Sequence, residues 1–462
     1  MTAAVGTDRD FSGALLVPGS PQYEAARQVW NGMIDRRPAA VARCRDAADV
    51  SAALRYADRA GLAVTVRGGG HNVAGTAVAD GALMIDLSPM NDVVVDPAAA
   101  LVRAGGGCLL RDVDRATTRY GLACPAGVVS HTGLGGLALG GGYGWLARTW
   151  GLTCDHLVAA EVVLADGTVV EADDDSHPEL LWALRGGGGN FGVVTRFTLA
   201  LRPVGPVYFR RAVYELSEAV PVLAAYQAFA EQQSDDVHAV GSIHHVTAND
   251  WVPAALAGRP ALFLSVACFG DPAEGPESTD GLFEAVEPVA GTVGLLDYRT
   301  LQSLGDTSEP HGNRYYTKSG YLTEVSGAAA ELALAGADMC SQASSVDFEF
   351  LRGAIARPSG AERSAFPNRE APYICTASAQ WTDPAQDAPN AAWARRTLDR
   401  LVPWNHGGVY VNYLQDAESS DAGVSRVVGA YGAPRYRRLA EAKSRYDPGN
   451  RFRSNQNVRP SR

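Results

Sequence analysis

Short runs of apolar residues, each of strand length, recur along the first part of the chain. They include residues 63–66 (AVTV), 83–87 (LMIDL) and 162–164 (VVL). Turn residues close the runs, as at Asp80-Gly81 and Asp166-Gly167. Short apolar segments bounded by Gly and Asp are typical of buried strands. The pattern therefore predicts β-strands at these positions.

A helix is predicted between Asp46 and Gly61. Asp46 is a suitable N-cap residue, because its side chain can accept a hydrogen bond from a backbone N–H of the first turn. Val50, Leu54 and Ala57 then recur at helical spacing. Gly61 closes the segment, since glycine readily adopts the left-handed conformation that ends helices.

The pattern changes after about residue 205, where clusters of glycine end. Longer helical repeats and strands follow, among them the apolar run 261–266 and the alternating run 346–350. Alternation of apolar and polar residues predicts a strand with one buried face. We therefore place a domain boundary near Val204, just after Arg202-Pro203.

The last helical pattern covers residues 436–446 and stops at a Pro-Gly turn. Leu439, Lys443 and Tyr446 recur there at helical spacing. Seven basic residues lie between positions 435 and 453, against two acidic ones. Such a run of charge predicts a solvated helix face.

Composition narrows the class of protein. The chain has 462 residues, of which 46% are hydrophobic and 20% charged, with a net charge of −11. A length about three times that of a typical domain favours two or three domains. The acidic balance argues against nucleic acid as a partner, and neither an apolar run of membrane-spanning length nor a secretory leader is evident. Seven scattered cysteines suit a reducing compartment and exclude a zinc ribbon. We therefore expect a cytoplasmic enzyme without a metal site.

The 50 glycines are concentrated in three clusters, at residues 68–70, 133–144 and 186–192. The first follows a strand, as a Rossmann phosphate loop does, but turn and strand residues follow it instead of a helix, and no GxGxxG is present. A nicotinamide-binding fold is therefore rejected. Successive glycines can still hold phosphate, because their N–H groups can converge on an anion. Three clusters in one stretch predict a large nucleotide lying across the domain.

These clusters, together with two segments near the C-terminus, resemble the flavin domain of the vanillyl-alcohol-oxidase superfamily. The resemblance is greatest to the berberine-bridge-enzyme-like branch of that superfamily, in particular to its bacterial FAD-linked oxidases. The resemblance implies an α+β protein. A PCMH-type FAD-binding domain would comprise residues 1–204 and 404–462, and a substrate domain with an antiparallel sheet flanked by helices would comprise residues 205–403. The motifs that carry it are Arg67-Gly-Gly-Gly-His71 with Asp86-Leu-Ser88, Gly133-Leu-Gly-Gly136 with Gly140-Gly-Gly-Tyr-Gly144, residues 182–194 (WALRGGGGNFGVV), Val411-Asn-Tyr413 and residues 452–457 (FRSNQN).

The same resemblance implies which residues bind FAD. They lie in the glycine clusters and in the two C-terminal segments. They are Arg67, Gly68, Gly69, Gly70, His71, Asn72, Gly75, Leu87, Val129, Ser130, Thr132, Gly133, Gly135, Gly136, Leu137, Gly140, Gly141, Tyr143, Gly144, Asn190, Gly192, Val193, Val194, Asn412, Tyr413, Asn455 and Asn457.

His71 is expected to be bonded to the flavin. In similar enzymes a ring nitrogen of the histidine that ends RGGGH is joined to the flavin 8α-methyl carbon, and a neutral imidazole is a competent nucleophile. Many relatives carry a second tether, a cysteine eleven residues before the GGGYG loop. That position is Val129 here, and Cys124 is five residues too early. We therefore expect one covalent bond, through His71, and treat Cys124 as a small apolar residue.

Flavin oxidases transfer a hydride to the flavin from a substrate carbon that bears an alcohol, an amine or a related group. A side chain must accept the proton that leaves the substrate as the hydride is transferred. Glu349 matches the catalytic glutamate that precedes an FPHR segment in the family, although Asn368 replaces its histidine here. Tyr413 matches a tyrosine that lies over the flavin, and its phenol would be a base only if its surroundings lowered its pKa. Tyr143, beside the glycine loop, is the third predicted catalytic-site residue, and we interpret it as a wall of the pocket rather than an acid or base.

The resemblance implies an FAD-linked oxidase that acts on a small organic metabolite, such as an alcohol, an amine or a polyketide-type compound. Dioxygen would be the acceptor and hydrogen peroxide the product. Two alternatives stay open: an oxygenase that uses a flavin-N5-oxide, for which Thr132 and Leu137 line the oxygen side, and a flavoprotein that only sequesters a drug-like compound. The substrate and the oligomeric state are not readable. Polar candidates for the substrate wall are His244, His245, Tyr315, Tyr316, Lys318 and Tyr321.

Overall fold

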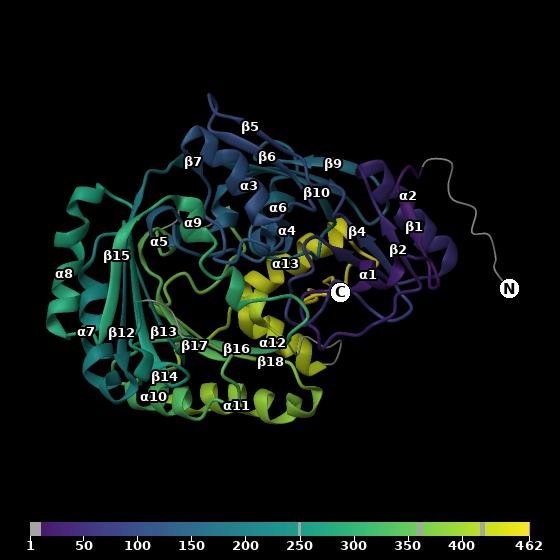
Figure 1. The fold of residues 1–462 in the computed structure, drawn as a ribbon. Helices are drawn as coiled ribbons and strands as arrows, with labels where there is room; N and C mark the ends of the chain where they lie inside the picture. Colours follow the sequence, from purple (N-terminus) through teal and green to yellow (C-terminus); the bar gives the residue numbers. More distant parts are fainter. Residues whose placement is uncertain (1–10, 248–250, 358–362, 416–420, 462) are drawn as a thin grey trace.

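The structure is a computed structural model, and it describes residues 11–247, 251–357, 363–415 and 421–461. Figure 1 shows two small sheets on one side of the molecule and one large sheet on the other. The C-terminal helices, in yellow, return to the side that holds the N-terminal strands (Figure 1). This mixed architecture confirms the predicted α+β class. The seven strands of the large sheet all fall between Val207 and Trp381, while the two domain boundaries stay predictions.

A four-stranded sheet in the order β1-β2-β4-β3 forms the N-terminal part. Strands β2, β4 and β3 run parallel, and the edge strand β1 is antiparallel to β2. The predicted helix is present as α2: the Asp46 side chain accepts a hydrogen bond from Asp49 N, and Gly61 is left-handed with φ 63°. Val50, Leu54 and Ala57 pack against the sheet in one core. The elements are β1 (Ala14–Leu16), α1 (Tyr23–Arg27), β2 (Ala40–Arg43), α2 (Ala47–Ala60), β3 (Val64–Arg67) and β4 (Leu83–Asp86).

A five-stranded antiparallel sheet in the order β5-β6-β10-β8-β9 follows. Short helices cover it, and α13 from the C-terminus packs against α6. A two-stranded pair, β7 with β11, lies beside it. The elements are β5 (Val93–Asp96), β6 (Leu101–Gly105), α3 (Leu110–Thr117), β7 (Leu122–Ala123), α4 (Leu134–Leu139), α5 (Ala147–Trp150), β8 (Leu157–Val163), β9 (Val169–Ala172), α6 (Pro178–Leu184), β10 (Val193–Ala200), β11 (Arg202–Pro203), α12 (Asp421–Tyr431) and α13 (Ala433–Tyr446).

The large sheet has seven antiparallel strands in the order β15-β12-β14-β13-β17-β18-β16. Helices α7, α8, α10 and α11 cover its outer face (Figure 1), where the largest apolar core of the protein lies. The elements are β12 (Val207–Glu215), α7 (Ala219–Gln232), β13 (Val237–His245), β14 (Pro260–Cys268), α8 (Gly275–Ala285), β15 (Ala290–Leu296), α9 (Tyr298–Gln302), β16 (Arg314–Leu322), α10 (Ala329–Ala337), β17 (Ser345–Phe350), β18 (Tyr373–Trp381) and α11 (Asp387–Arg400).

Strand alternation decides which side chains of this sheet face the FAD-binding side. In β17, Val346, Phe348 and Phe350 belong to the core under the helices. Because successive side chains of a strand point to opposite faces, Asp347 and Glu349 point to the inner face. The inner face meets the N-terminal half of the chain, where Trp145 packs edge-on against Phe209 and His238.

The same alternation corrects part of the predicted substrate wall. Tyr316 is buried in the core under the helices, and Arg395 of α11 lies over its ring at 4.6 Å. Lys318 shares this face, with Nζ 5.9 Å from the Tyr316 ring. His245 alternates with inner-facing His244 on β13 and so points outward as well. Of the predicted wall residues, His244, Tyr315 and Tyr321 remain on the inner face.

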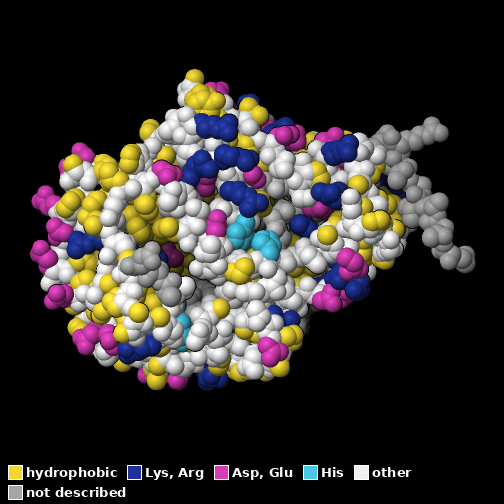
Figure 2. All heavy atoms as spheres, viewed as in Figure 1, with side chains coloured by type: hydrophobic (Ala, Val, Ile, Leu, Met, Phe, Trp, Pro, Cys, Tyr) yellow, Lys and Arg dark blue, Asp and Glu magenta, His cyan; other side chains and the backbone are white. Residues whose placement is uncertain are grey.

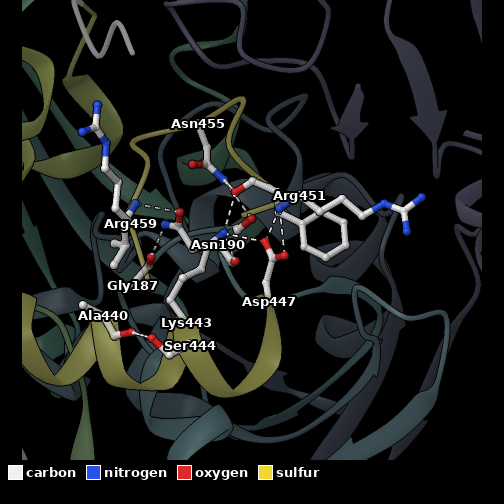
Figure 3. Close-up of polar contacts among 12 residues, drawn as sticks. Gly187, Asn190, Ala440, Lys443, Ser444, Asp447, Arg451, Asn455 and Arg459 are labelled. Carbon is white, nitrogen blue, oxygen red and sulfur yellow. Dashed lines mark hydrogen bonds and ion pairs between the residues drawn. The ribbon is translucent and has the colours of Figure 1, made fainter. Parts of the chain in front are cut away.

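The predicted C-terminal helix forms as α13, and Arg437 and Arg445 are exposed on it, as expected for a solvated face. Lys443 departs from this pattern, because it is buried together with Leu439 and Tyr446. The Lys443 side chain is fully buried and forms an ion pair with Asp447 at 2.7 Å. Lys443 Nζ also donates to Asn190 O and Phe452 O (Figure 3). A buried ammonium group needs such partners, so Lys443 belongs to an internal network while the other charged residues of the helix reach the surface.

Candidate functional site

Two of the glycine clusters meet backbone to backbone. A Cβ atom on Gly69 would lie 2.5 Å from Gly133 Cα, and one on Gly133 would lie 2.3 Å from Gly69 N. No side chain fits at either position, so glycine is required at both. The loop Gly68–His71 follows β3 directly, and its backbone N–H groups donate to no acceptor among the described residues. These free donors suit an anion such as a nucleotide phosphate.

The GGGYG loop is joined to the C-terminal VNY segment. Gly140 lies so close to Asn412 that a Cβ would be 2.0 Å from Oδ1. Asn412 Nδ2 donates to Leu137 O at 3.3 Å and to the Tyr410 hydroxyl at 2.9 Å. The same hydroxyl accepts a hydrogen bond from Gly142 N at 3.0 Å. The segment that carries Tyr413 is thereby fixed against the loop that carries Tyr143.

The third glycine cluster is held by the C-terminal segment. Asn190 Nδ2 donates to Gly187 O and Gln456 O, and its Oδ1 accepts from Val458 N. Asn455 Nδ2 donates to Gly189 O (Figure 3). Because every polar atom of the Asn190 side chain bonds to protein, its part is to position the loop. Gly192, Val193 and Val194 lie at the start of β10 and are buried.

His71 lies in an aromatic and histidine cluster. Its ring stacks on Trp30 at 4.3 Å, and Trp30 stacks in turn on Tyr315 at 3.6 Å. His71 Nε2 lies 3.1 Å from His131 Nδ1. Burial lowers the pKa of His71 to about 3, with His131 and His311 adding to the shift. The imidazole is therefore neutral across the physiological range, as a nucleophile must be. Figure 2 shows histidine side chains gathered near the centre of the face in view, beside a band of Lys and Arg.

The three predicted catalytic residues are brought together between the sheet and the glycine loop. The hydroxyl groups of Tyr143 and Tyr413 are 3.3 Å apart. Burial raises the pKa of both phenols, and the negative charge of Glu349 raises each further. Both tyrosines are therefore protonated near neutral pH and act as hydrogen-bond donors. The condition for Tyr413 to be the base, a lowered pKa, is not met.

Glu349 is oriented by a histidine that the sequence analysis did not single out. His238 on β13 lies beside β17, and its Nε2 is 3.2 Å from Glu349 Oε2. The exposed fraction of the side chain is 1% for His238 and 13% for Glu349. His238 Nδ1 is buried without a partner. Nε2 is thus the ring nitrogen that can donate a hydrogen bond to the carboxylate, and this contact holds Glu349 in place.

Two further carboxyl groups share this region. Asp347 accepts hydrogen bonds from Ser242 and Ser345, both at 2.6 Å. Burial raises the pKa of Asp347 to about 6 and that of Glu309 to about 8, and Asp347 adds to the second shift. Neither carboxyl group forms an ion pair with Lys or Arg within the described part of the chain. The wall is therefore rich in groups that accept hydrogen bonds or carry negative charge.

The remaining predicted residues are distributed as follows. Val129 lies near Gly305. The backbone N and the Oγ of Ser130 both donate hydrogen bonds to the Asp306 carboxylate, so these two donors are already used within the protein. Thr132 O accepts from Leu110 N, which fixes the loop next to Gly133. Cys124 is buried in an apolar core, as predicted for a small apolar residue. Asn368, in place of the family's histidine, donates to Ala430 O at 3.2 Å.

Sequence reasoning missed His131, His238, Trp30, Tyr410 and Glu309. His131 lies between Ser130 and Thr132 of the predicted flavin loop, and nothing in its spacing pointed to His71, sixty residues earlier. His238 is the second residue of β13, a strand whose two faces the sequence alone did not assign. Both contacts join segments far apart in the chain, so only the folded structure reveals them.

The fold and these loops define a flavin-dependent oxidoreductase. The family profile described as FAD binding domain matches residues 38–173, and the one described as berberine and berberine like matches residues 409–459. An FAD-linked oxidoreductase of Dictyostelium discoideum is 30% identical over 456 residues, which is 97% of this chain and 95% of that protein. The chain belongs to the berberine-bridge-enzyme-like family of FAD-linked oxidoreductases.

One further relative and two solved structures are similar to this chain over nearly its whole length. The (R)-6-hydroxynicotine oxidase of Paenarthrobacter nicotinovorans is 28% identical over 474 residues, covering 100% of this chain and 99% of that protein. The crystal structure of 6-hydroxy-D-nicotine oxidase from Arthrobacter nicotinovorans superimposes with a TM-score of 0.85 at 27% identity, over 99% of this chain and 100% of that one. Berberine bridge enzyme from Eschscholzia californica shares the fold, with a TM-score of 0.85 at 20% identity over 97% of each chain.

The residues present fit FAD. Beyond the free N–H groups of Gly68–His71, the Oδ1 atoms of Asn455 and Asn457 are buried without a hydrogen-bond partner in the described structure. Burying a polar atom without a hydrogen-bond partner costs free energy of folding, so these two amide oxygens indicate that a ligand with hydrogen-bond donors binds beside them. No helix among the described residues is long and apolar enough to cross a membrane.

Proposed function

We propose that the protein is an oxidase in which Glu349 takes a proton from an alcohol or amine substrate, while the flavin accepts the hydride. Dioxygen then reoxidises the flavin, and hydrogen peroxide is released. The observation that supports this most directly is the position of Glu349. Its carboxylate lies on the inner sheet face, is held by His238, and is close enough to Tyr143 and Tyr413 to raise the pKa of both phenols.

In this proposal the chain's own residues divide the work. Glu349 accepts the proton, as a positioned carboxylate commonly does. His238 holds that carboxylate by a hydrogen bond, and the two tyrosines donate hydrogen bonds toward the substrate heteroatom. Bound FAD supplies the two-electron acceptor. The glycine loops and Asn412 position it, and His71 tethers it through a single bond.

The carboxyl groups of the wall favour one kind of substrate. Asp347 and Glu349 share the inner face of the sheet, so a substrate carboxylate would be disfavoured there, whereas a hydroxyl or a basic nitrogen finds acceptors. The relative named (R)-6-hydroxynicotine oxidase acts on a compound of that second kind. A panel of alcohols, amines and aromatic polyketides, each with and without a carboxyl group, is therefore the right screen.

The test is anaerobic flavin reduction followed by its absorbance, with peroxide measured in air. With an active substrate, Glu349→Gln should slow reduction by about 10² to 10⁴, while FAD attachment and reoxidation stay nearly unchanged. Asp347→Asn is the matched control on the same strand face. If Glu349→Gln reduces the flavin at close to the wild-type rate, Glu349 is not the base. A compound that only shifts the absorbance bands is bound without turnover.

The tether has its own test. Denatured wild-type protein should keep flavin fluorescence on a gel, His71→Ala should lose it, and Cys124→Ala should keep it. Cys124 is the matched control because it is buried in the apolar core. Fluorescence that survives in His71→Ala would show that another residue carries the flavin.

A further inference from the structure

One ring nitrogen of His71 is already engaged. Nε2 lies 3.1 Å from His131 Nδ1, and the two ring centroids are 5.0 Å apart. The Trp30 ring covers one face of the His71 imidazole at an interplanar angle of 18°. No other described residue hydrogen-bonds His71 Nδ1. The ring is therefore held in one plane, and Nδ1 is the nitrogen that no other residue engages.

We propose that His131 is the positioning residue for flavin attachment: it keeps the His71 proton on Nε2, leaves the lone pair on Nδ1, and takes the Nε2 proton as the bond to the flavin forms. This rests on the proposed tether at His71. His131 acts through His71 and does not itself touch the flavin. The pairing follows a general rule, since the hydrogen bond made by one imidazole nitrogen decides which form the other takes.

Covalent attachment oxidises the flavin 8α-methyl carbon by two electrons. A bond forms between His71 Nδ1 and the flavin 8α-methyl carbon, and one C–H bond of that methyl group breaks. The methyl proton and the Nε2 proton leave, the latter to His131 Nδ1, and two electrons remain in the flavin. Dioxygen, the acceptor of the proposed oxidase reaction, takes the two electrons and two protons to give hydrogen peroxide.

The surroundings of His131 allow it to pass this proton on. His131 is only partly buried, and the exposed His311 ring lies 5.0 Å from it and 6.0 Å from His71. A route to water is therefore open on this side. Within the described part of the chain, no group of three or more His, Cys, Asp or Glu side chains is arranged to hold a metal ion. The contact between His71 and His131 is thus better explained by proton handling than by metal binding.

The experiment measures covalent attachment rather than turnover. Full-length wild type, His131→Ala, His131→Gln and His311→Ala are produced, and the mass of each denatured chain shows the fraction that carries flavin, at purification and during incubation with FAD in air. We expect attachment in His131→Ala to be slower by about 10², with FAD still bound to the native protein. His131→Gln can hold the hydrogen bond but cannot take a proton, so it should also be slow. His311→Ala should attach flavin as wild type does.

Adding imidazole to the variants tests whether the lost His131 ring itself is needed for attachment. Added imidazole should restore attachment in His131→Ala, because it can occupy the space of the lost ring, and should not restore it in His71→Ala. Attachment in His131→Ala at the wild-type rate, or slow attachment that imidazole leaves unchanged, would overturn the role of His131 while leaving the His71 tether intact. If wild type itself releases all its flavin on denaturation, the tether fails, and this inference fails with it.

Discussion

The Nε2 atom of His238 lies 3.2 Å from the Oε2 atom of Glu349, on two adjacent strands of the large sheet. His238 is on β13, two residues before Val240, which pairs directly with Glu349. Both side chains therefore project from the same face of the sheet. The imidazole fixes the carboxylate at the edge of the region that holds Tyr143 and Tyr413.

His238→Phe should slow flavin reduction, since it keeps a ring of similar size and removes the hydrogen-bond donor to Glu349. A hydrogen bond to a charged group is worth about 1.5–3 kcal/mol, so a decrease of about tenfold or more is expected. Flavin attachment should be unchanged. Stopped-flow reduction with an active substrate measures the effect. A rate within about threefold of wild type would show that Glu349 does not depend on His238.

The pH dependence of reduction should show no contribution from the tyrosines. Burial raises the pKa of Tyr143 and Tyr413 above the usual value near 10, so both phenols stay protonated below that pH. Tyr413→Phe should therefore lower the reduction rate only modestly, by removing a donor. The measurement is the reduction rate from pH 6 to pH 10 in both proteins. A wild-type rate that keeps rising towards pH 10, with no such rise in Tyr413→Phe, would assign the base to Tyr413.

Asp114 should make wild type less stable as the pH rises. Burial raises the pKa of this carboxyl to about 7, and it accepts a hydrogen bond from Gln302 Nε2 at 3.4 Å. Between about pH 4 and pH 7 the unfolded chain loses this proton while the folded chain keeps it, so folding is progressively disfavoured up to pH 7 and the effect is constant above it.

Asp114→Asn removes this dependence and keeps an acceptor for Gln302. Relative to wild type, the variant should gain up to about 4 kcal/mol of unfolding free energy on going from pH 4 to pH 8. Urea unfolding at both pH values measures the difference. Parallel stability curves for the two proteins would contradict the prediction.

Lys443→Met should destabilise the protein strongly. It would leave Asp447 buried without its cation, and Asn190 O and Phe452 O without their donor (Figure 3). Breaking a buried ion pair in this way costs about 3–5 kcal/mol. Arg437→Met is the matched control, because Arg437 is exposed on the same helix and surface charges contribute about 1 kcal/mol or less.

The unfolding free energy from urea titration distinguishes the two variants. Because the Lys443 network ties Phe452 and Asn190 together, Lys443→Met should also release flavin more readily when the tether is absent, which His71→Ala provides as the background. Equal stability of the Lys443 and Arg437 variants would show that the buried network contributes little.

Local sequence signals were reliable where neighbours along the chain decide the structure. Helix α2 forms between Asp46 and Gly61 because the cap and the end signal are local. Strand β17 places Glu349 opposite Phe348 because alternation is a property of the strand itself. The charge pattern of α13 predicted its solvated face but not the exception, since a count of charges does not show that Lys443 meets Asp447 and two carbonyl groups inside the protein.

The amino-acid order by itself determined the family, the flavin loops and the identity of His71, Glu349 and Tyr413 as candidates, because these rest on short motifs in a set order. Only the tertiary structure decided what surrounds them. His131 reaches His71, His238 reaches Glu349, and Tyr143 reaches Tyr413 across separations of 60, 111 and 270 residues. Burial and neighbouring charge then set the protonation of each group, and both depend on packing between distant segments rather than on the residues beside them in the chain.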